Sequence, residues 1–358
     1  MLKNVSHPGQ VLLSEITKLG MSQKELALRT GVSEKHISTV INGVKDISST
    51  FGRKLDIALG SKKGYWTKLQ SEYDQYQLAL GAENDISSDE IAVLSQLKEV
   101  MSTFLKKGYI HNDCGDTQKM LQMREVLRVN DLTVIPQITY SAAYRAQIKG
   151  STNINPFVLF AWQRMCELET ENADSKSCFN VELLRDSIPS IKQTMFEADI
   201  NNAVSNLKQI FANCGVSFEV VEHFRGAPVQ GFIKQTDKDK VILCLTIRGK
   251  KADRFWFSLF HEIGHLINGD LNVRFVDFDS VKSETEAAAD KFARNALIDD
   301  SMYSAFVQAN KYHNLHDIKE FSHKAGVPHW ITIGRLHNDE WLDWSYFASE
   351  IPSYEWID

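Results

Sequence analysis

The feature that most constrains the fold is the spacing of small, glycine and branched apolar residues across positions 23–42. Ala27 is small, as it must be where two short helices cross closely. Gly31 suits a turn that needs a positive φ. Ile37 and Val40 recur with helical spacing and can pin a second helix onto the first. The pattern predicts a helix-turn-helix.

In such motifs the second helix lies in the major groove of DNA, so the polar residues on its outer face and N-terminus become candidate contacts. Gln23 and Lys45 lie where they can touch phosphate, while the Ser, Lys and Thr side chains can reach base edges. The predicted DNA-binding residues are Gln23, Ser33, Lys35, His36, Ser38, Thr39, Asn42 and Lys45. The alternative is a helical hairpin that packs against protein instead of DNA.

The charge distribution favours DNA binding. Residues 1–63 hold ten Lys or Arg against five Asp or Glu, a net charge of +5, whereas the whole chain carries -6 and the remainder therefore -11. A basic head on an acidic body is typical of a nucleic-acid-binding module joined to a domain with another role.

The overall composition is that of a folded protein outside the membrane. Hydrophobic residues make up 43% and charged residues 24%, with a mean hydropathy of -0.27, and we expect a cytoplasmic protein with no membrane partner. The five cysteines are scattered and lack CxxC spacing, which indicates neither a disulfide framework nor a thiolate zinc site.

The predicted fold class is mainly α with a small β-sheet, in three parts. Residues 1–80 form an all-helical head, 81–187 a helical middle region, and 188–358 an α+β domain. Apolar runs at 216–224, 228–235 and 241–249 predict strands, the last two joined by a polar turn at 236–240. The strand at 241–249 has two interpretations, an edge that pairs with an extended peptide or a buried strand without a ligand.

The segment HEIGH at 261–265 predicts a metal site. His261 and His265 are four residues apart, so on a helix both imidazoles leave one face and can hold one Zn2+ ion. Glu262 is placed to accept a proton from metal-held water and to pass it to a leaving amine. Asp253 is a candidate N-cap for this helix, and Gly269 is a candidate C-terminal cap.

A catalytic zinc needs a third protein ligand and an open fourth position. We assign the third ligand to Glu286, with Glu284 as its rival, and we assign Asp290, one helical turn later, to orienting a ligand imidazole. Ser283 leaves an alternative open, because Ser283 with Glu286 also has the spacing of a capping box. Two further candidates, as donors to the transition state, flank the helix of residues 329–337: His329 and His337.

The head resembles a known family of DNA-binding regulators. The segments HPGQVLLSEITKLGMSQKELALRTGVSEKHISTVINGVKDIS and ALGSKKGYWTKLQSEYD resemble the XRE family, and more narrowly its HigA-like antitoxins. The resemblance implies a lambda-repressor-like fold and a homodimer that binds an inverted-repeat operator in double-stranded DNA and represses its own promoter.

The C-terminal region resembles the ImmA/IrrE metallopeptidases, over residues 248–270, 284–298, 326–341 and the closing SYEW. The resemblance implies a zincin-like α+β metallopeptidase fold with an HExxH…E zinc site, and members are implicated in cleaving regulatory repressors. The sequence AAAD at 287–290 departs from the EAN or EAD of many members but leaves Glu286 and Asp290 in place.

Three functional hypotheses follow. The first is a DNA-binding regulator with a zinc endopeptidase that cleaves a regulatory protein. The second is an antitoxin and repressor whose metallopeptidase-like domain holds a toxin without cutting it. The third is a plain repressor in which the two histidines are structural.

Overall fold

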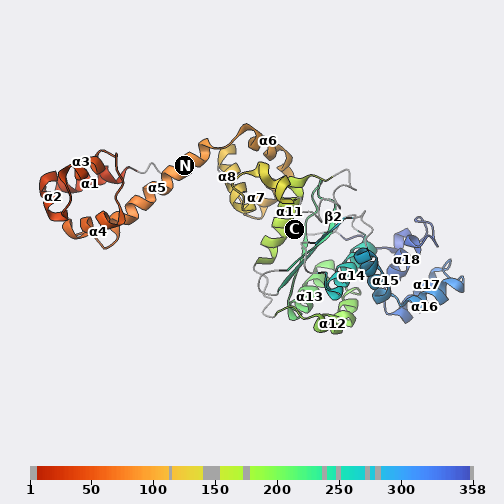
Figure 1. Cartoon of the computed structure of the whole chain (residues 1–358). Coiled ribbons are helices and arrows are strands. Elements are labelled where there is room, and N and C mark those ends of the chain that lie inside the picture. Colours follow the sequence, from red (N-terminus) through yellow and green to blue (C-terminus); the bar gives the residue numbers. More distant parts are fainter. Residues whose placement is uncertain are drawn as a thin grey trace. The chain divides into compact units, whose positions relative to one another are not determined.

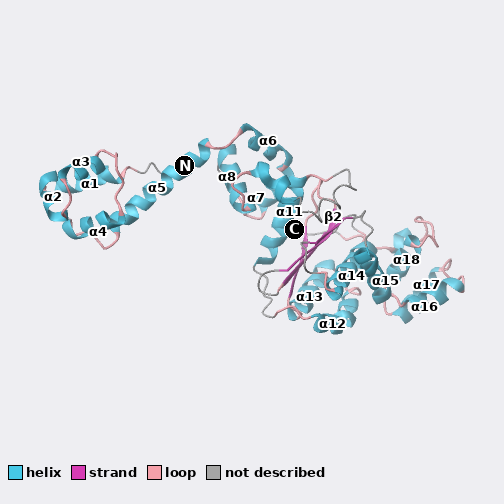
Figure 2. Cartoon of the chain, in the orientation of Figure 1, coloured by secondary structure: helices cyan, strands magenta, loops and turns pink. Residues whose placement is uncertain are grey.

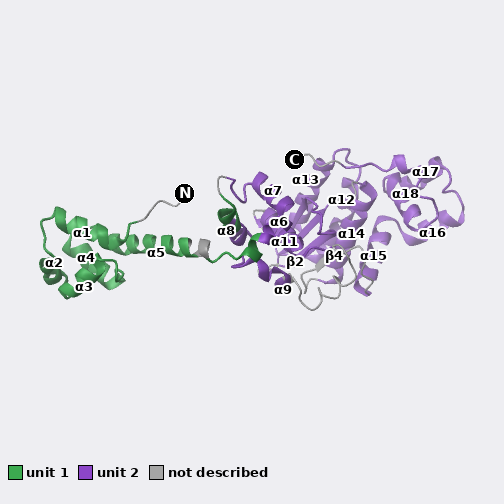
Figure 3. Cartoon of the chain, turned by 90° about the horizontal axis from the view of Figure 1, so that it is seen from above, with its two compact units in different colours: residues 1–91, 114–121 green, residues 92–113, 122–358 purple. Residues whose placement is uncertain are grey.

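The structure is a computed structural model that describes residues 6–112, 115–139, 154–171, 178–235, 240–246, 251–270, 275–278 and 284–354 (Figure 1). The chain divides into two compact units, residues 1–91 with 114–121 and residues 92–113 with 122–358 (Figure 3). The three-part division at 80 and 187 stays a prediction, and both of its boundaries fall inside helices. No helix in the described ranges is both long and apolar enough to cross a membrane.

The first unit begins with five helices around one small core. They are α1 (Pro8–Lys18), α2 (Gln23–Thr30), α3 (Glu34–Ile41), α4 (Ser49–Ala58) and α5 (Tyr65–Asn84). Ser22, Ser33 and Ser48 cap α2, α3 and α4, each accepting a hydrogen bond from the backbone N–H three residues on. The core joins all five helices through fully buried side chains: Leu12, Leu26, Ile37, Val40, Leu55 and Trp66.

The predicted turn between α2 and α3 is confirmed. Gly31 has φ 62° and ψ 38°, the left-handed conformation that the sequence required. Ala27 is buried where α2 packs against α3, and the backbone N–H of Val32 donates to the carbonyl of Ala27 at 3.2 Å. The local pattern therefore specifies this pair of helices.

Five of the described helices come next along the chain. They are α6 (Ser88–Gln96), α7 (Lys98–Lys106), α8 (Asp116–Leu127), α9 (Ile135–Thr139) and α11 (Pro156–Glu171). The apolar pattern of residues 91–105 runs without interruption, but the helix breaks at Leu97, which has φ -100° and ψ 11° and is fully buried. Val93 and Leu94 before the break and Val100 and Phe104 after it are buried.

The sheet is small and mixed, as the predicted fold class required (Figure 2). Its strands are β1 (Val216–Val221), β2 (Val229–Gln235), β3 (Val241–Thr246) and β4 (Phe275–Phe278), in the order β1-β3-β2-β4. β1 and β3 are parallel, and the other two pairs are antiparallel. The predicted turn between β2 and β3 lies mostly outside the described residues.

The suggestion that the strand at 241–249 is a peptide-binding edge is wrong. β3 pairs with β1 on one side and with β2 on the other, and all six of its residues are buried. The alternative of a buried strand is the correct one.

Seven helices of the second unit follow or flank the sheet. They are α12 (Val181–Thr194), α13 (Ile200–Asn213), α14 (Ala252–Asn268), α15 (Glu284–Leu297), α16 (Asp300–Gln308), α17 (Leu315–Ala325) and α18 (His329–Asn338). Helix α14 carries HEIGH and is buried along almost its whole length. It ends at Gly269 with φ 81°, as predicted, but Asp253 does not cap it, because the helix starts one residue earlier and Lys251 occupies the cap position.

Candidate metal centre and DNA-binding helix

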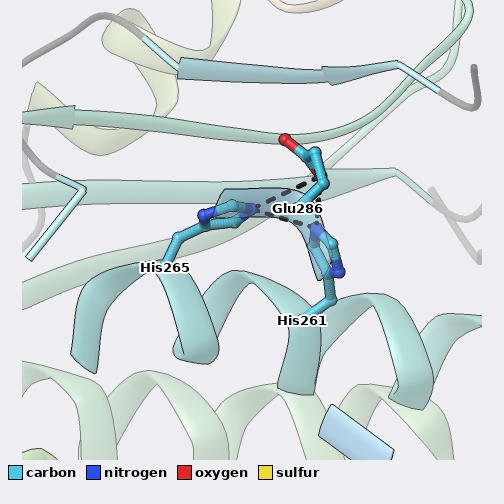
Figure 4. Close-up of side chains that lie close together, drawn as sticks. All are labelled: His261, His265 and Glu286. Carbon is cyan, nitrogen blue, oxygen red and sulfur yellow. Dashed lines mark hydrogen bonds and ion pairs between the residues drawn. The ribbon is translucent and has the colours of Figure 1, made fainter. Parts of the chain in front are cut away.

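Helices α14 and α15 bring three side chains together. The Nε2 atoms of His261 and His265 are 3.0 Å apart, and Glu286 Oε2 lies 3.1 Å from His261 Nε2 and 3.6 Å from His265 Nε2. Figure 4 shows both rings leaving one face of α14 towards Glu286. Zinc–nitrogen and zinc–oxygen bonds of about 2.0–2.1 Å give a tetrahedron with edges of about 3.3 Å. The three atoms therefore have the spacing of three tetrahedral ligands.

Each histidine has a carboxylate behind its ring. Asp290 Oδ1 lies 2.8 Å from His261 Nδ1, and Asp270 Oδ2 lies 2.9 Å from His265 Nδ1. An ionised carboxylate only accepts hydrogen bonds, so both Nδ1 atoms carry a hydrogen, and in the neutral rings both Nε2 atoms direct lone pairs at the centre. Three lone pairs facing one another are favourable when a cation lies between them.

Charge and burial agree with that arrangement. His261, His265 and Glu286 are all buried. Burial on its own raises the pKa of Glu286, but when the two histidine rings also carry a hydrogen on Nε2, their hydrogen bonds to this carboxylate outweigh burial and lower that pKa to about 2. Burial on its own lowers the pKa of His265, but its hydrogen bonds to Glu286 and Asp270 and the charge of Glu262 outweigh it and raise that pKa. The surroundings stabilise positive charge at the centre.

Close packing of α14 on α15 holds the ligands at these distances. A Cβ added at Gly264 would lie 3.0 Å from the Cα of Ala289 and 3.1 Å from its carbonyl oxygen. The glycine inside HEIGH and one alanine of AAAD therefore let the two backbones approach. The contribution of Gly264 was not predicted from the sequence.

Glu262 lies on the same helix, and its side chain is fully buried. A Cβ added at Gly231 would lie 1.9 Å from Glu262 Oε1, so the backbone of β2 passes directly over this carboxylate. The contact was not predicted, although a glycine within a strand signals a close approach of another group.

Several candidates lie outside the cluster. Glu284, the rival to Glu286, is exposed in the first turn of α15, and Ser283 lies outside the described residues. The cluster of three side chains includes neither His329 nor His337. His329 Nε2 is 2.9 Å from Glu350 Oε2, and His337 Nε2 donates to the carbonyl of Tyr346 at 2.7 Å, so both rings are held by the C-terminal segment.

Asp270 is the residue of the centre that sequence reasoning missed. Its signal was weak, an acidic residue directly after the glycine that ends the helix. Asp290, by contrast, could be found because it shares a helical face with Glu286.

In the first unit, α3 and its capping residues Ser33 and Asn42 carry six of the eight predicted DNA contacts. Lys35, Asn42 and Lys45 are exposed, and Ser38 and Thr39 are partly exposed. The ring of His36 packs edge-on against Phe51, with centroids 4.9 Å apart, so part of this side chain faces α4. Gln23 is half-buried at the start of α2, and the Ser33 hydroxyl accepts from the backbone N–H of His36 at 3.2 Å.

The comparisons with known proteins concern the N-terminal region of the chain. Residues 14–66 match the helix-turn-helix family. Virulence-associated protein A′ of Dichelobacter nodosus is 32% identical over 96 residues, which cover 26% of this chain and 79% of that protein. Through its N-terminal region, the chain belongs to the helix-turn-helix family of virulence-associated protein A′. A solved structure described as an antidote protein of a plasmid maintenance system from Nostoc punctiforme is 29% identical, covers 22% of this chain and 88% of that chain, and has a TM-score of 0.22.

As a helix-turn-helix protein, the chain has a DNA-binding region formed by α2 and α3. The family match ends at residue 66, inside the first unit, and does not extend to the metal cluster. The individual contact residues on α3 and the roles of the cluster residues remain predictions.

Proposed function

We propose that this helix-turn-helix protein is an antitoxin-type transcriptional regulator whose second unit is a zinc-dependent endopeptidase. The observation that carries the proposal is the convergence of His261 Nε2, His265 Nε2 and Glu286 Oε2, with one carboxylate behind each histidine ring. Two imidazoles and one carboxylate are the donor set of a catalytic zinc site that keeps a fourth position open. The resemblance of residues 248–270, 284–298, 326–341 and the closing SYEW to ImmA/IrrE metallopeptidases, with their zincin-like fold, supports the same function.

A zinc ion bound there would supply a Lewis acid that polarises a peptide carbonyl and increases the acidity of water. The chain's own residues would supply the rest. His261, His265 and Glu286 hold the ion, and Asp290 fixes the His261 ring through its Nδ1. Glu262 accepts a proton from water and returns it to the leaving amine.

The first unit would bind DNA. We propose that a homodimer binds an inverted repeat in double-stranded DNA through α3, with Ser38, Thr39 and Asn42 towards bases and Lys35 and Lys45 towards phosphates. The protein that the second unit cleaves would be a regulatory protein that acts at the operon to which this homodimer binds.

Glu262→Gln tests the endopeptidase, because it removes the base and keeps the side-chain volume. Cells expressing wild type or Glu262→Gln at equal levels are compared by mapping new protein N-termini. The proposal expects at least one N-terminus that is present with wild type and absent with Glu262→Gln, while zinc content is equal. Identical sets of N-termini would contradict proteolysis.

A second function is favoured by one observation. Glu262 is fully buried beneath β2 at Gly231, so proton transfer requires the carboxylate to separate from that strand. If the Glu262 carboxylate stays against β2, the second unit would hold a toxin without cutting it. That function predicts a stable complex between the full chain and the toxin, with the toxin intact and with equal affinity for wild type and Glu262→Gln.

A further inference from the structure

The C-terminal end of α14 connects a helix cap to the metal cluster. Gly269 ends the helix with φ 81° and ψ 22°, and its backbone N–H donates to the carbonyl of His265. The backbone N–H of Asp270 donates to the same carbonyl at 3.1 Å. The left-handed residue thus turns the chain back over the last turn of the helix, where His265 lies.

That turn brings the Asp270 side chain to His265. Asp270 Oδ2 lies 2.9 Å from His265 Nδ1, and the side chains are 22% and 0% exposed, respectively. The only residue between the end of the helix and this carboxylate is Gly269, so the conformation of Gly269 fixes where the carboxylate lies. A residue that resists positive φ would change the direction of the chain just before Asp270.

We infer that Gly269 and Asp270 form a positioning device for the metal ligand His265. Gly269 sets the place of Asp270, and Asp270 holds the hydrogen on Nδ1 and leaves Nε2 directed at Glu286. The inference rests on the proposed metal site and extends it to two residues outside the ligand set. The helix cap thereby contributes to metal affinity as well as to helix stability.

The two ligand histidines are therefore held in different ways. Asp290, behind His261, comes from α15 and has a side chain that is 53% exposed. Asp270 comes from the turn after α14 itself and is less exposed. Exposure weakens a charge-assisted hydrogen bond, so Asp270 has the stronger effect on metal affinity.

The first test changes Asp270 in the full-length protein. Zinc affinity is measured by competition with a chromophoric chelator, and Co2+ absorption reports the ligand geometry. Asp270→Ala is expected to weaken zinc binding by about 10- to 100-fold, the range for such outer carboxylates. Asp270→Asn keeps an acceptor oxygen for Nδ1–H and is expected to fall between Asp270→Ala and wild type. Asp290→Asn is the comparison, with the smaller expected loss.

The second test separates the cap from general destabilisation. Gly326 ends α17 with φ 67°, and neither Gly269 nor Gly326 has an atom within 4 Å of an added Cβ. Gly269→Ala and Gly326→Ala should lower the Tm by similar amounts, but only Gly269→Ala should weaken zinc binding and alter the Co2+ spectrum. Gly269→Asn should recover most of the affinity, because Asn tolerates the left-handed conformation.

The results distinguish a failure of the positioning device from a failure of the proposed metal site. If the wild type binds zinc and both Gly269→Ala and Asp270→Ala bind it equally well, the positioning device is overturned and the metal site stands. If folded wild type binds no zinc, the proposed metal site fails as well, and the inference fails with it.

Discussion

The DNA-binding region and the metal cluster are assembled in different ways. Residues 23–42 make the DNA-binding pair α2 and α3 from one continuous segment, whose turn and caps are local. The cluster joins His261 and His265 on α14 to Glu286 on α15, and its outer carboxylates come from α15 and from the turn after α14. A local site depends on backbone conformation at a few positions, whereas the assembled site depends on how closely two helices pack.

Metal removal should therefore lower the stability of the second unit and leave that of the first unchanged. With free zinc at 100 times its Kd, binding stabilises the folded form by about 2.7 kcal/mol. A chelator should lower the Tm of the transition of the second unit and leave that of the first unchanged, as measured by calorimetry. His261→Ala is the control, because the chelator should no longer shift its Tm. An equal shift of both transitions would contradict the separation.

Gly264→Ala tests helix packing at the assembled site. The added Cβ meets the backbone of Ala289 at 3.0 Å, so α14 and α15 must separate. We expect a loss of about 1–3 kcal/mol in the free energy of unfolding, weaker zinc binding and unchanged operator affinity. Denaturant unfolding and zinc titration measure the two losses. Unchanged zinc affinity would show that the packing does not set the ligand distances.

Gly31→Ala is the matching change in the local site. Gly31 has φ 62° in the turn between α2 and α3. An alanine in this left-handed conformation lowers the free energy of unfolding by about 1–2 kcal/mol. Operator affinity should fall and zinc affinity should stay at the wild-type value. A loss of zinc binding in this variant would break the independence of the two sites.

Ser33→Ala removes one cap without touching the turn. The Ser33 hydroxyl accepts from the backbone N–H of His36 at 3.2 Å, and losing such a cap costs about 1 kcal/mol. The Tm of the first unit should fall while the Tm of the second unit is unchanged. A variant as stable as wild type would show that the Ser33 cap does not stabilise α3.

Lys35→Ala tests a single proposed phosphate contact. Losing one such contact reduces the slope of log affinity against log salt by about 1. Lys68→Ala is the control, since Lys68 is exposed on α5 and pairs with Glu72. Fluorescence anisotropy with operator DNA at several salt concentrations measures both slopes. Equal slopes for wild type and Lys35→Ala would place Lys35 away from phosphate.

The sequence was most informative where structure is local. The turn at Gly31 and the end of α14 at Gly269 follow from residue types and short spacings, and both are confirmed. Glu286 and Asp290 are one helical turn apart on α15, and both contact His261.

Tertiary arrangement explains what the sequence did not reveal. β3 was considered a possible edge because the sequence does not give the order of the strands, and the sheet has β3 between β1 and β2. Asp270 was missed because its position depends on a left-handed residue rather than on helical spacing. His329 and His337 were included because of their residue type, but contacts with Glu350 and Tyr346 hold them elsewhere.

The central claim is that a helix-turn-helix protein carries a metal site built from His261, His265 and Glu286. Its most direct test is zinc titration of the chelator-treated full chain, beside His261→Ala and Glu286→Ala, with folding checked by circular dichroism. The account predicts one zinc per wild-type chain and none at comparable affinity in either folded variant. Folded wild-type protein that binds no zinc, or variants that bind it as tightly, would contradict the claim.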